Sequence, residues 1–403
     1  MEPDGDGRQL LTSQEVAPLL AAAVSRAGGD LLDWRLDHVD HQPGCSTTAT
    51  YRAEVRWPFG VRAELLGCSA RSGGLAPDER AGQVFVKAGR EVATWLHPAD
   101  PDLPGLARAA YPERMSELLT GLGLVSGPLS GADVELRMVA YRPRRRAVLQ
   151  ARAAGRCFYV KVLREAIFDD VLHRHELLAA SDLPAPQLLA TTDDHLLVLA
   201  ELPGTPLARA MFTDAEPCTA EQVVALLDGL PVELTGLARR TPWSDQLEHY
   251  ARVVARSLPE QEARLEWLVD TIAGGLAGIP PGQEAVHGDF HEGQLHVAGG
   301  RTVGLLDVDT IGPGRRVDDL ACLLAHLSTV QRMNAEQAAR VQDLLARWIA
   351  VFDERVNRAE LRLRAAAVAV SLATGPHRGQ EPHWQRETVA ILDAADALVR
   401  QAG

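Results

Sequence analysis

Hydrophobic and polar residues alternate with a period of two in the first part of the chain, after one stretch of helical spacing. The helical spacing covers Ser13–Arg26 and ends at two glycines. Three alternating segments follow, separated by Pro-Phe-Gly and Ser-Gly-Gly turn residues: 48–57, 61–70 and 83–89. We expect a small antiparallel sheet here, then a proline-rich loop at 97–106 and a helix at Leu106–Leu122.

A second alternating region predicts another sheet with a helix inside it. Three strands are expected across 133–164, joined by an arginine-rich turn and an Ala-Ala-Gly turn, and a helix follows Lys161. Two more strands lie within 184–202 and end at Pro-Gly-Thr-Pro, 203–206. Beyond this run the spacing is helical to the C-terminus, except in segment 284–320. No internal repeat is evident, although the two sheet regions could be distant echoes of each other.

These patterns predict an α+β fold with a β-rich half followed by an α-rich half. A chain of 403 residues suits two or three packed lobes. We expect an N-terminal extension at 1–125, a β-rich lobe at 126–203 and a helical lobe at 204–403. Because ligands commonly bind where two lobes meet, an active site is expected between them.

Composition narrows the class of protein. The formal charge of −13 argues against general affinity for nucleic acid phosphates or anionic lipids. The N-terminal residues do not form a signal pattern, and no apolar run is long enough to cross a membrane, so we expect a cytoplasmic protein. Five scattered cysteines without paired spacing argue against a disulfide scaffold or a zinc site.

The segment HGDFHEGQLH, 287–296, has the residue types that phosphoryl transfer to a hydroxyl group requires. Such a transfer needs a group that accepts the hydroxyl proton and oxygen ligands for the metal ions that neutralise phosphate charge. Asp289 suits the first task, and Gln294 and Asp307 suit the second. Residues 295–306 are typical of a hairpin around two glycines. Since a hairpin brings its ends together, these three side chains should converge on one site.

This arrangement resembles a known family, the aminoglycoside phosphotransferase and choline kinase group, whose fold is that of protein kinases. The resemblance rests on the HGDFHEGQ run, the hairpin with LLDVD and the run DDLACLL at 318–324. It implies a bilobal, protein-kinase-like fold, ATP and Mg2+ as cofactors, Asp289 as catalytic base, and Gln294 and Asp307 as magnesium ligands. Gln294 stands where the family has asparagine. Both offer a carboxamide oxygen, so we interpret the glutamine as a conservative variation.

In the β-rich lobe the resemblance assigns Lys161 to the nucleotide phosphates and Glu176, on the following helix, to an ion pair with that lysine. Lys87 is the only other lysine in the chain. Arginine replaces lysine readily on a surface but poorly where a compact charge is needed, so both lysines are informative. We prefer Lys161, because Lys87 leads into a proline-rich loop and not into a helix with a glutamate.

Two other segments of this lobe are expected at the nucleotide. The turn 141–149 occupies the place of the family's glycine-rich phosphate cover but contains no glycine. Arg144 and Arg145 in this turn either meet ATP phosphates or form a solvated hairpin tip. Segment 197–204 resembles the family's hinge, where backbone groups around Glu201 and Leu202 would bond the adenine edge.

The resemblance places the acceptor on the helical lobe. The stretch 205–286 has about twice as many acidic as basic residues, which suits a cationic, amine-bearing molecule, although most acids on helices are simply solvated. Asp309, Arg378 and Trp384 are candidate acceptor contacts. Asp309 could instead contact the metal or be a simple loop cap, and ordinary helix-loop packing is the alternative for Arg378 and Trp384. The extension is similar to the cap of maltokinase-like and glucosamine kinase-like members, which favours a sugar or amino-sugar acceptor.

The leading hypothesis is an ATP- and Mg2+-dependent kinase of a small hydroxylated molecule, an aminoglycoside or amino sugar, acting as a monomer or homodimer. One alternative is a kinase of peptide serine or threonine in natural-product maturation. Another is a pseudokinase scaffold that only binds nucleotide. The retained set of Asp289, Asp307, Lys161 and Glu176 argues against the scaffold. The acceptor, its phosphorylated hydroxyl and a preference for ATP or GTP are left open.

Overall fold

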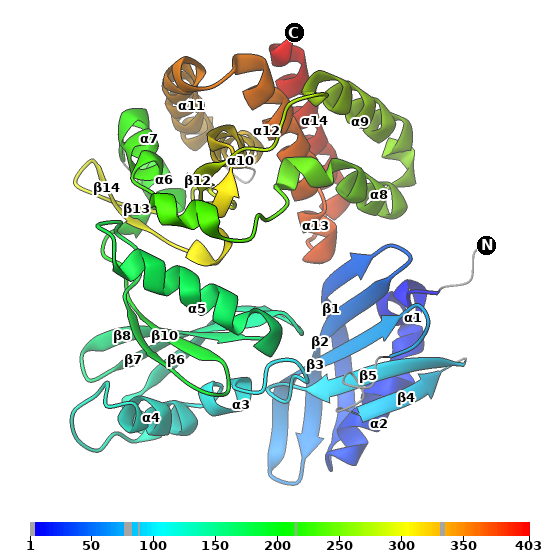
Figure 1. Ribbon diagram of the computed structural model, residues 1–403. Helices are drawn as coiled ribbons and strands as arrows, with labels where there is room; N and C mark the ends of the chain where they lie inside the picture. Colours follow the sequence, from blue (N-terminus) through cyan, green and yellow to red (C-terminus); the bar gives the residue numbers. More distant parts are fainter. Residues whose placement is uncertain (1–4, 76–82, 88, 214–215, 331–334) are drawn as a thin grey trace. The chain divides into compact units, whose positions relative to one another are not determined.

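The computed structural model describes residues 5–75, 83–87, 89–213, 216–330 and 335–403. The chain forms two compact units (Figure 1). Unit 1 comprises Met1–Asp169, Leu188–Glu201 and Arg378–Pro382; unit 2 comprises Asp170–Gln187, Leu202–His377 and His383–Gly403. The main division falls between Glu201 and Leu202. The α+β class is confirmed, with the strands concentrated in unit 1 and the helices in unit 2.

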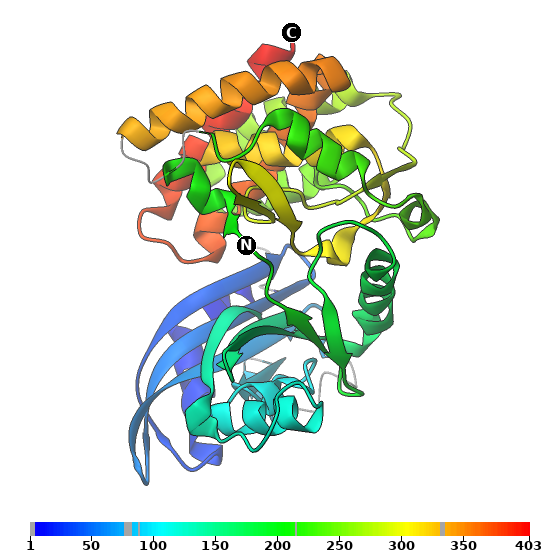
Figure 2. The same cartoon turned by 90° about the vertical axis from the view of Figure 1, so that its left-hand side faces the viewer.

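The first part of unit 1 is a five-stranded antiparallel sheet with short helices. The strands are β1 (Asp30–Gln42), β2 (Ser46–Trp57), β3 (Gly60–Arg71), β4 (Gln83–Lys87) and β5 (Arg90–Leu96), and the helices are α1 (Arg8–Thr12), a 3-10 helix (Gln14–Val16) and α2 (Ala17–Arg26). The strand order is β1-β2-β3-β5-β4. Alternate residues of β2, including Ala49, Tyr51 and Val55, are buried with Leu20 and Val24 of α2 in one hydrophobic core. Helix α2 lies along one face of this sheet (Figure 2).

The sequence did not predict β1 or β5, and the expectation that Lys87 leads into a loop was wrong. β1 carries acidic and histidine residues along most of its length, and few of its side chains are buried, so it lacks a clear hydrophobic alternation. β5 follows β4 directly, with Lys87 paired to Arg90. The proline-rich loop begins only after β5. Ala88, inside the predicted strand 83–89, lies outside the described residues.

The second part of unit 1 is another five-stranded antiparallel sheet. Its elements are α3 (Leu106–Ala109), α4 (Pro112–Gly121), a 3-10 helix (Gly131–Asp133), β6 (Glu135–Arg142), β7 (Arg146–Ala153), β8 (Arg156–Leu163), β9 (Leu188–Thr191) and β10 (Leu196–Ala200). The order is β6-β7-β8-β10-β9. Helix α5 (Glu165–Ala179) lies between β8 and β9 in the chain, as predicted from the pattern after Lys161.

The predicted helix Leu106–Leu122 is divided in two at a proline. Tyr111 is extended because it precedes Pro112, which then begins α4. Leu106 and Leu119 are buried with Phe158 and other residues of the second sheet in one core. Residues 103–122 therefore pack with the second sheet, although the predicted boundary at 125 assigned them to the extension.

Unit 2 is mostly helical. Its helices are α6 (Leu207–Thr213), α7 (Ala220–Asp228), α8 (Leu247–Ser257), α9 (Glu262–Leu276), α10 (Arg316–Thr329), α11 (Ala335–Arg355), α12 (Arg358–Leu372), α13 (Gly375–Arg378) and α14 (Trp384–Ala402), with 3-10 helices at Val232–Gly236, Trp243–Gln246 (η5), Pro259–Gln261 and Val308–Thr310. Its short strands are β11 (Thr205–Pro206), β12 (Glu284–Val286), β13 (Leu295–Ala298), β14 (Arg301–Leu305) and β15 (Gly312–Gly314). No helix among the described residues has the length and apolarity needed to span a membrane.

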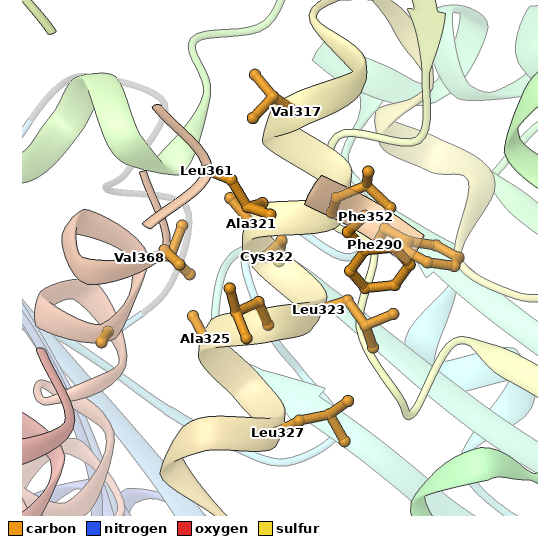
Figure 3. Close-up of a cluster of buried hydrophobic side chains, with 14 of the residues drawn as sticks. Phe290, Val317, Ala321, Cys322, Leu323, Ala325, Leu327, Phe352, Leu361 and Val368 are labelled. Carbon is orange, nitrogen blue, oxygen red and sulfur yellow. The ribbon is translucent and has the colours of Figure 1, made fainter. Parts of the chain in front are cut away.

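The core of unit 2 is built around α10. Ala321, Cys322 and Leu323 of this helix are buried together with Leu361 and Val368 of α12 (Figure 3). Leu320 and Ala325 are buried as well, so the helix is apolar on nearly all sides, as expected for a helix at the centre of a core. The first turn of α10 carries Arg316, Asp318 and Asp319, and Asp319 contacts the loop that follows β12.

Candidate active site

The loop after β12 is held by a buried aspartate at the start of α10. The carboxylate of Asp319 accepts hydrogen bonds from the backbone N–H groups of His287, at 2.7 Å, and Gly288, at 2.8 Å. Gly288 has a φ of 80°, and a Cβ there would lie 2.8 Å from the Thr310 carbonyl oxygen, so this position requires glycine. Burial raises the pKa of Asp319, while His287 and the two backbone N–H groups oppose the rise.

His287 links this loop to the end of the β13–β14 hairpin. Its ring is fully buried; Nε2 lies 2.8 Å from the Leu306 carbonyl oxygen, and Nδ1 accepts the backbone N–H of Asp289 at 3.3 Å. Nε2 therefore donates to Leu306, which fixes the tautomer. Phe290 is also fully buried, with its ring 5.8 Å from that of His287, and lies in the core beside Leu323 and Phe352 (Figure 3). Asp289 is left half-buried at the surface of the loop.

The hairpin brings together Gln294 and Asp307, two of the three side chains that were expected to converge. β13 and β14 pair from Leu295↔Leu305 outward, and the backbone N–H of Leu306 donates to the Gln294 carbonyl at 2.7 Å. The turn consists of Gly299 and Gly300, both with positive φ, which matches the twist of a tight hairpin. Gln294 Nε2 and Asp307 Oδ2 are 3.5 Å apart.

A carboxylate and a carboxamide at this spacing fit a hard divalent cation. A flip of the side-chain amide exchanges the oxygen and nitrogen atoms of Gln294. After such a flip the oxygen faces Asp307, and the two residues can bind an ion between them. Asp307 has a left-handed φ of 49°, an uncommon conformation that clusters at functional sites. The residues present therefore suit Mg2+. Gln294 Nε2 also lies 3.0 Å from Nε2 of His291.

A second group of metal-ligand types lies behind the loop. His291, Glu292 and His326 are the one such cluster among the described residues. The two imidazole rings stack at 4.4 Å and 8°, and Glu292 Oε2 lies 3.4 Å from Nδ1 of His326. Parallel rings do not direct their nitrogen lone pairs to one point, and His291 Nδ1 already accepts the Gly293 N–H at 3.1 Å. The geometry is that of one carboxylate, Glu292, next to two stacked imidazole rings, and not that of a metal site. Burial and the charge of His326 lower the pKa of His291.

One contact of the candidate base was not predicted from the sequence. The indole Nε1 of Trp243, in η5, donates to Asp289 Oδ1 at 3.0 Å. Trp243 is 46 residues before Asp289 and belongs to no motif, so spacing gave no signal for it.

Lys161 lies in the middle of the second sheet, on β8 between β7 and β10, and is 6% exposed. Lysine is seldom this buried unless its charge is paired, so Lys161 is a candidate to bind an anionic group such as a phosphate. Glu176 has a side chain that is 61% exposed, and its ion pair, at 3.8 Å, is with His173 on the same helix. The predicted pairing of Lys161 with Glu176 stays a prediction. The buried polar residues of α5 are Arg174, which donates to the Ile311 carbonyl, and His175.

Arg144 is held by residues that precede the second sheet. Its side chain is 10% exposed and pairs with Asp102 at 3.0 Å, and its backbone N–H donates to Asp100 at 2.8 Å. Another guanidinium nitrogen donates to the Ser69 hydroxyl of β3 at 3.2 Å. These contacts disfavour the predicted role at ATP phosphates, because they would have to break first. Arg145 is 52% exposed and pairs with Asp40 of β1 at 3.1 Å.

The other predicted residues lie as follows. Glu201 is exposed and pairs with Arg152 at 3.4 Å, and Leu202 is half-buried; the hinge role assigned to them concerns backbone groups. Asp309 is buried, 3.6 Å from His175, which favours packing over substrate contact. Arg378 ends α13, and Trp384 begins α14 with its ring 4.7 Å from that of His377. Their roles stay predictions.

Acidic residues of the helical region gather in one groove between α8 and α9. Its volume is about 420 Å³, and Glu248, Glu262, Glu266 and Asp270 line it together with Arg252. Residues 214 and 215 of the acidic stretch lie outside the described residues.

The model of the phosphotransferase enzyme family matches residues 125–364. A thermostable mutant of aminoglycoside phosphotransferase APH(4)-Ia, in complex with ADP and hygromycin B, has a TM-score of 0.50 at 16% identity, over 71% of this chain and 97% of that one. Ethanolamine kinase from Plasmodium vivax has a TM-score of 0.45 at 11% identity, over 72% and 90%. No curated protein sequence matches the chain.

Proposed function

The chain belongs to the phosphotransferase enzyme family, and on this premise we propose that it transfers the γ-phosphoryl group of ATP to a hydroxyl group of a small, amine-bearing molecule. The family model covers more than half of the 403 residues, which confirms the predicted family and enzyme class. An amino sugar or an aminoglycoside is the acceptor class that we favour.

The observation that carries the proposal is the convergence of Gln294 and Asp307 beside the loop that bears Asp289. Asp289 takes the proton of the acceptor hydroxyl while the hydroxyl oxygen forms its bond to the γ-phosphorus. The bond from that phosphorus to the bridging oxygen breaks, and its electron pair leaves with ADP. Mg2+, when bound, would be held by Asp307 and Gln294 and would neutralise charge on the phosphate oxygens.

In the second sheet, Lys161 would hold the nucleotide phosphates with its buried ammonium group. Glu176 would have to leave His173 to pair with that lysine, and Arg144 would have to leave Asp102 to reach phosphate. Backbone groups at Glu201 and Leu202 are the proposed adenine contacts. Of these assignments, Lys161 has the strongest support.

The acceptor class is proposed from charge and from the fold. The acidic groove between α8 and α9 suits an amine-bearing molecule, and Asp309, Arg378 and Trp384 are further candidate contacts. APH(4)-Ia was crystallised with hygromycin B, so this compound is a natural probe.

The test is phosphate transfer followed by mass spectrometry. The protein is incubated with ATP, Mg2+ and a panel that contains glucosamine, hygromycin B, streptomycin and a serine-rich peptide. We expect transfer to an amino sugar or aminoglycoside, its loss in Asp289→Asn, and its retention in the control Asp169→Asn, an exposed carboxylate on α5. A protein that only shifts its melting temperature with nucleotide would contradict the proposal and favour a scaffold, and transfer to the peptide alone would favour the peptide kinase.

A further inference from the structure

The hydrogen bond between Trp243 and Asp289 has no part in the mechanism proposed so far. The indole N–H occupies Oδ1 of the carboxylate at 3.0 Å. Within the described ranges, Trp243 is the one side chain that hydrogen-bonds this carboxylate, and Oδ2 has no hydrogen-bond partner among them. The two oxygens of the candidate base are therefore not equivalent.

We infer that Trp243 is a positioning residue for the proposed base: it holds Oδ1 of Asp289 so that Oδ2 takes the proton of the acceptor hydroxyl. The inference rests on the proposed function. A carboxylate can rotate about its terminal bond, and proton transfer is efficient only when the accepting oxygen lies within hydrogen-bond reach of the hydroxyl. A neutral donor on one oxygen restricts that rotation without taking the proton.

Trp243 is suited to this task because its own segment is anchored. The next residue, Ser244, is buried; its hydroxyl lies 3.2 Å from Asp318 and accepts a hydrogen bond from Arg364 at 3.0 Å. Arg364 also donates to Asp318 at 2.9 Å and to Glu360 at 2.8 Å. A buried network that connects η5, α10 and α12 thus fixes the backbone that carries the indole.

The same turn of α10 also anchors the base. Asp318 holds the segment of Trp243, and the adjacent Asp319 holds the loop of Asp289 through its two backbone bonds. The segment that carries the indole donor and the loop that carries the acceptor are therefore bonded to consecutive residues of one helix. These bonds fix the distance between Trp243 and Asp289, as a positioning role requires and simple packing does not.

The substitution Trp243→Phe distinguishes the effect of the indole hydrogen bond from the effect of aromatic packing. Trp243 packs against Tyr250 with ring centroids 5.8 Å apart, and Trp243→Phe keeps an aromatic ring there while it removes the N–H. Trp243→His restores an N–H donor on a smaller ring. Trp267→Phe is the matched control, because Trp267 is exposed on α9.

The first measurement needs no substrate. The chain has seven tryptophans, so 15N-labelled protein gives seven indole N–H signals. Trp243→Phe assigns the signal of interest by its loss. We expect this signal to lie downfield and to move upfield in Asp289→Ala, with the other six unchanged. A signal that does not respond to Asp289→Ala would overturn the hydrogen bond and the inference with it.

The second measurement is steady-state transfer with glucosamine and hygromycin B. We expect Trp243→Phe to lower kcat about tenfold through misorientation of the base, with the KM for ATP changed less than about twofold. Trp243→His should recover part of kcat, and Trp267→Phe should match the wild type. Equal kcat in Trp243→Phe and wild type would refute the positioning role and leave the proposed function intact. A wild type without any transfer would remove both.

Discussion

The two sheets of unit 1 have the same topology and different contents. Counted from its own first strand, each has the order 1-2-3-5-4, and each is preceded by helices that share its hydrophobic core. The sequence pattern hinted at this echo without establishing it. Only the second sheet has a buried lysine on its third strand and a long helix, α5, between its third and fourth strands. In the first sheet the buried polar residues of the third strand are limited to Ser69.

The difference teaches that this topology is a scaffold, and that chemistry depends on a few side chains placed on it. The first sheet and the residues just after it instead contact the β6–β7 turn, the part of the second sheet that is expected to lie over a nucleotide. Asp100, just after β5, accepts hydrogen bonds from the Tyr141 hydroxyl at 2.7 Å and from the Arg144 backbone N–H. Trp95 of β5 donates to Tyr141 at 3.0 Å. The β6–β7 turn, which occupies the place of the family's glycine-rich phosphate cover, is therefore held by residues of the N-terminal extension.

The sharpest test of the comparison uses the two lysines, one in each sheet. Lys161→Ala should lower phosphate transfer by about 10²–10³-fold, the usual effect of removing one charge-stabilising group. Lys87→Ala, at the end of β4, should leave the transfer rate unchanged. Steady-state kinetics with ATP checks both, and equal losses would mean that the first sheet also takes part in catalysis.

The next test concerns the fastening of the turn. Arg144→Ala should lower the free energy of unfolding by about 2–3 kcal/mol, because it leaves Asp102 and Ser69 without their partner in a largely buried place. Arg145→Ala removes the exposed pair with Asp40 and should cost less than about 1 kcal/mol. Urea unfolding measures both. Similar values for the two variants would show that Arg144 does not fasten the turn.

The pH dependence of the same link gives a smaller effect. Burial raises the pKa of Asp100, against hydrogen bonds from Arg144, Tyr141 and Asp102. A carboxyl with a raised pKa in the folded protein stabilises the fold below its unfolded pKa, and this contribution is lost as the pH rises through the folded value. Asp100→Asn cannot titrate. The stability gap between wild type and variant should therefore narrow as the pH rises from about 4 to 7 in urea unfolding. A constant gap would contradict the shift.

The smallest effect is expected at Trp95. Trp95→Phe removes the hydrogen bond to the Tyr141 hydroxyl and keeps most of the packing against Gly67, so it should cost about 1 kcal/mol. Thermal unfolding with Trp34→Phe as the control, an aromatic residue of the same sheet outside the link, measures the difference. If the stability lost in Trp95→Phe exceeds that of several hydrogen bonds, Trp95 contributes more to holding the turn than one hydrogen bond and the expectation is wrong.

The sequence predicted features that depend on neighbouring residues. The β13–β14 hairpin and the meeting of Gln294 with Asp307 both follow from local spacing. It failed where a contact joins distant segments. Trp243 reaches Asp289 across 46 residues, and Arg144 reaches Asp102 across 42, so no periodicity records either contact. β1 was missed because its many charged side chains hide the alternation of a strand.

The family match begins at residue 125, but the hydrophobic core of the second sheet begins earlier in the chain. Leu103, Leu106, Met115 and Leu119 fill that core, and all four precede the match. A protein that lacks the residues before 125 would expose the apolar face of the second sheet to water. We expect such a protein to aggregate. The part that identifies the family is therefore smaller than the part that can fold. A useful truncation has to begin before α3, and keeping the turn fastened requires the first sheet as well.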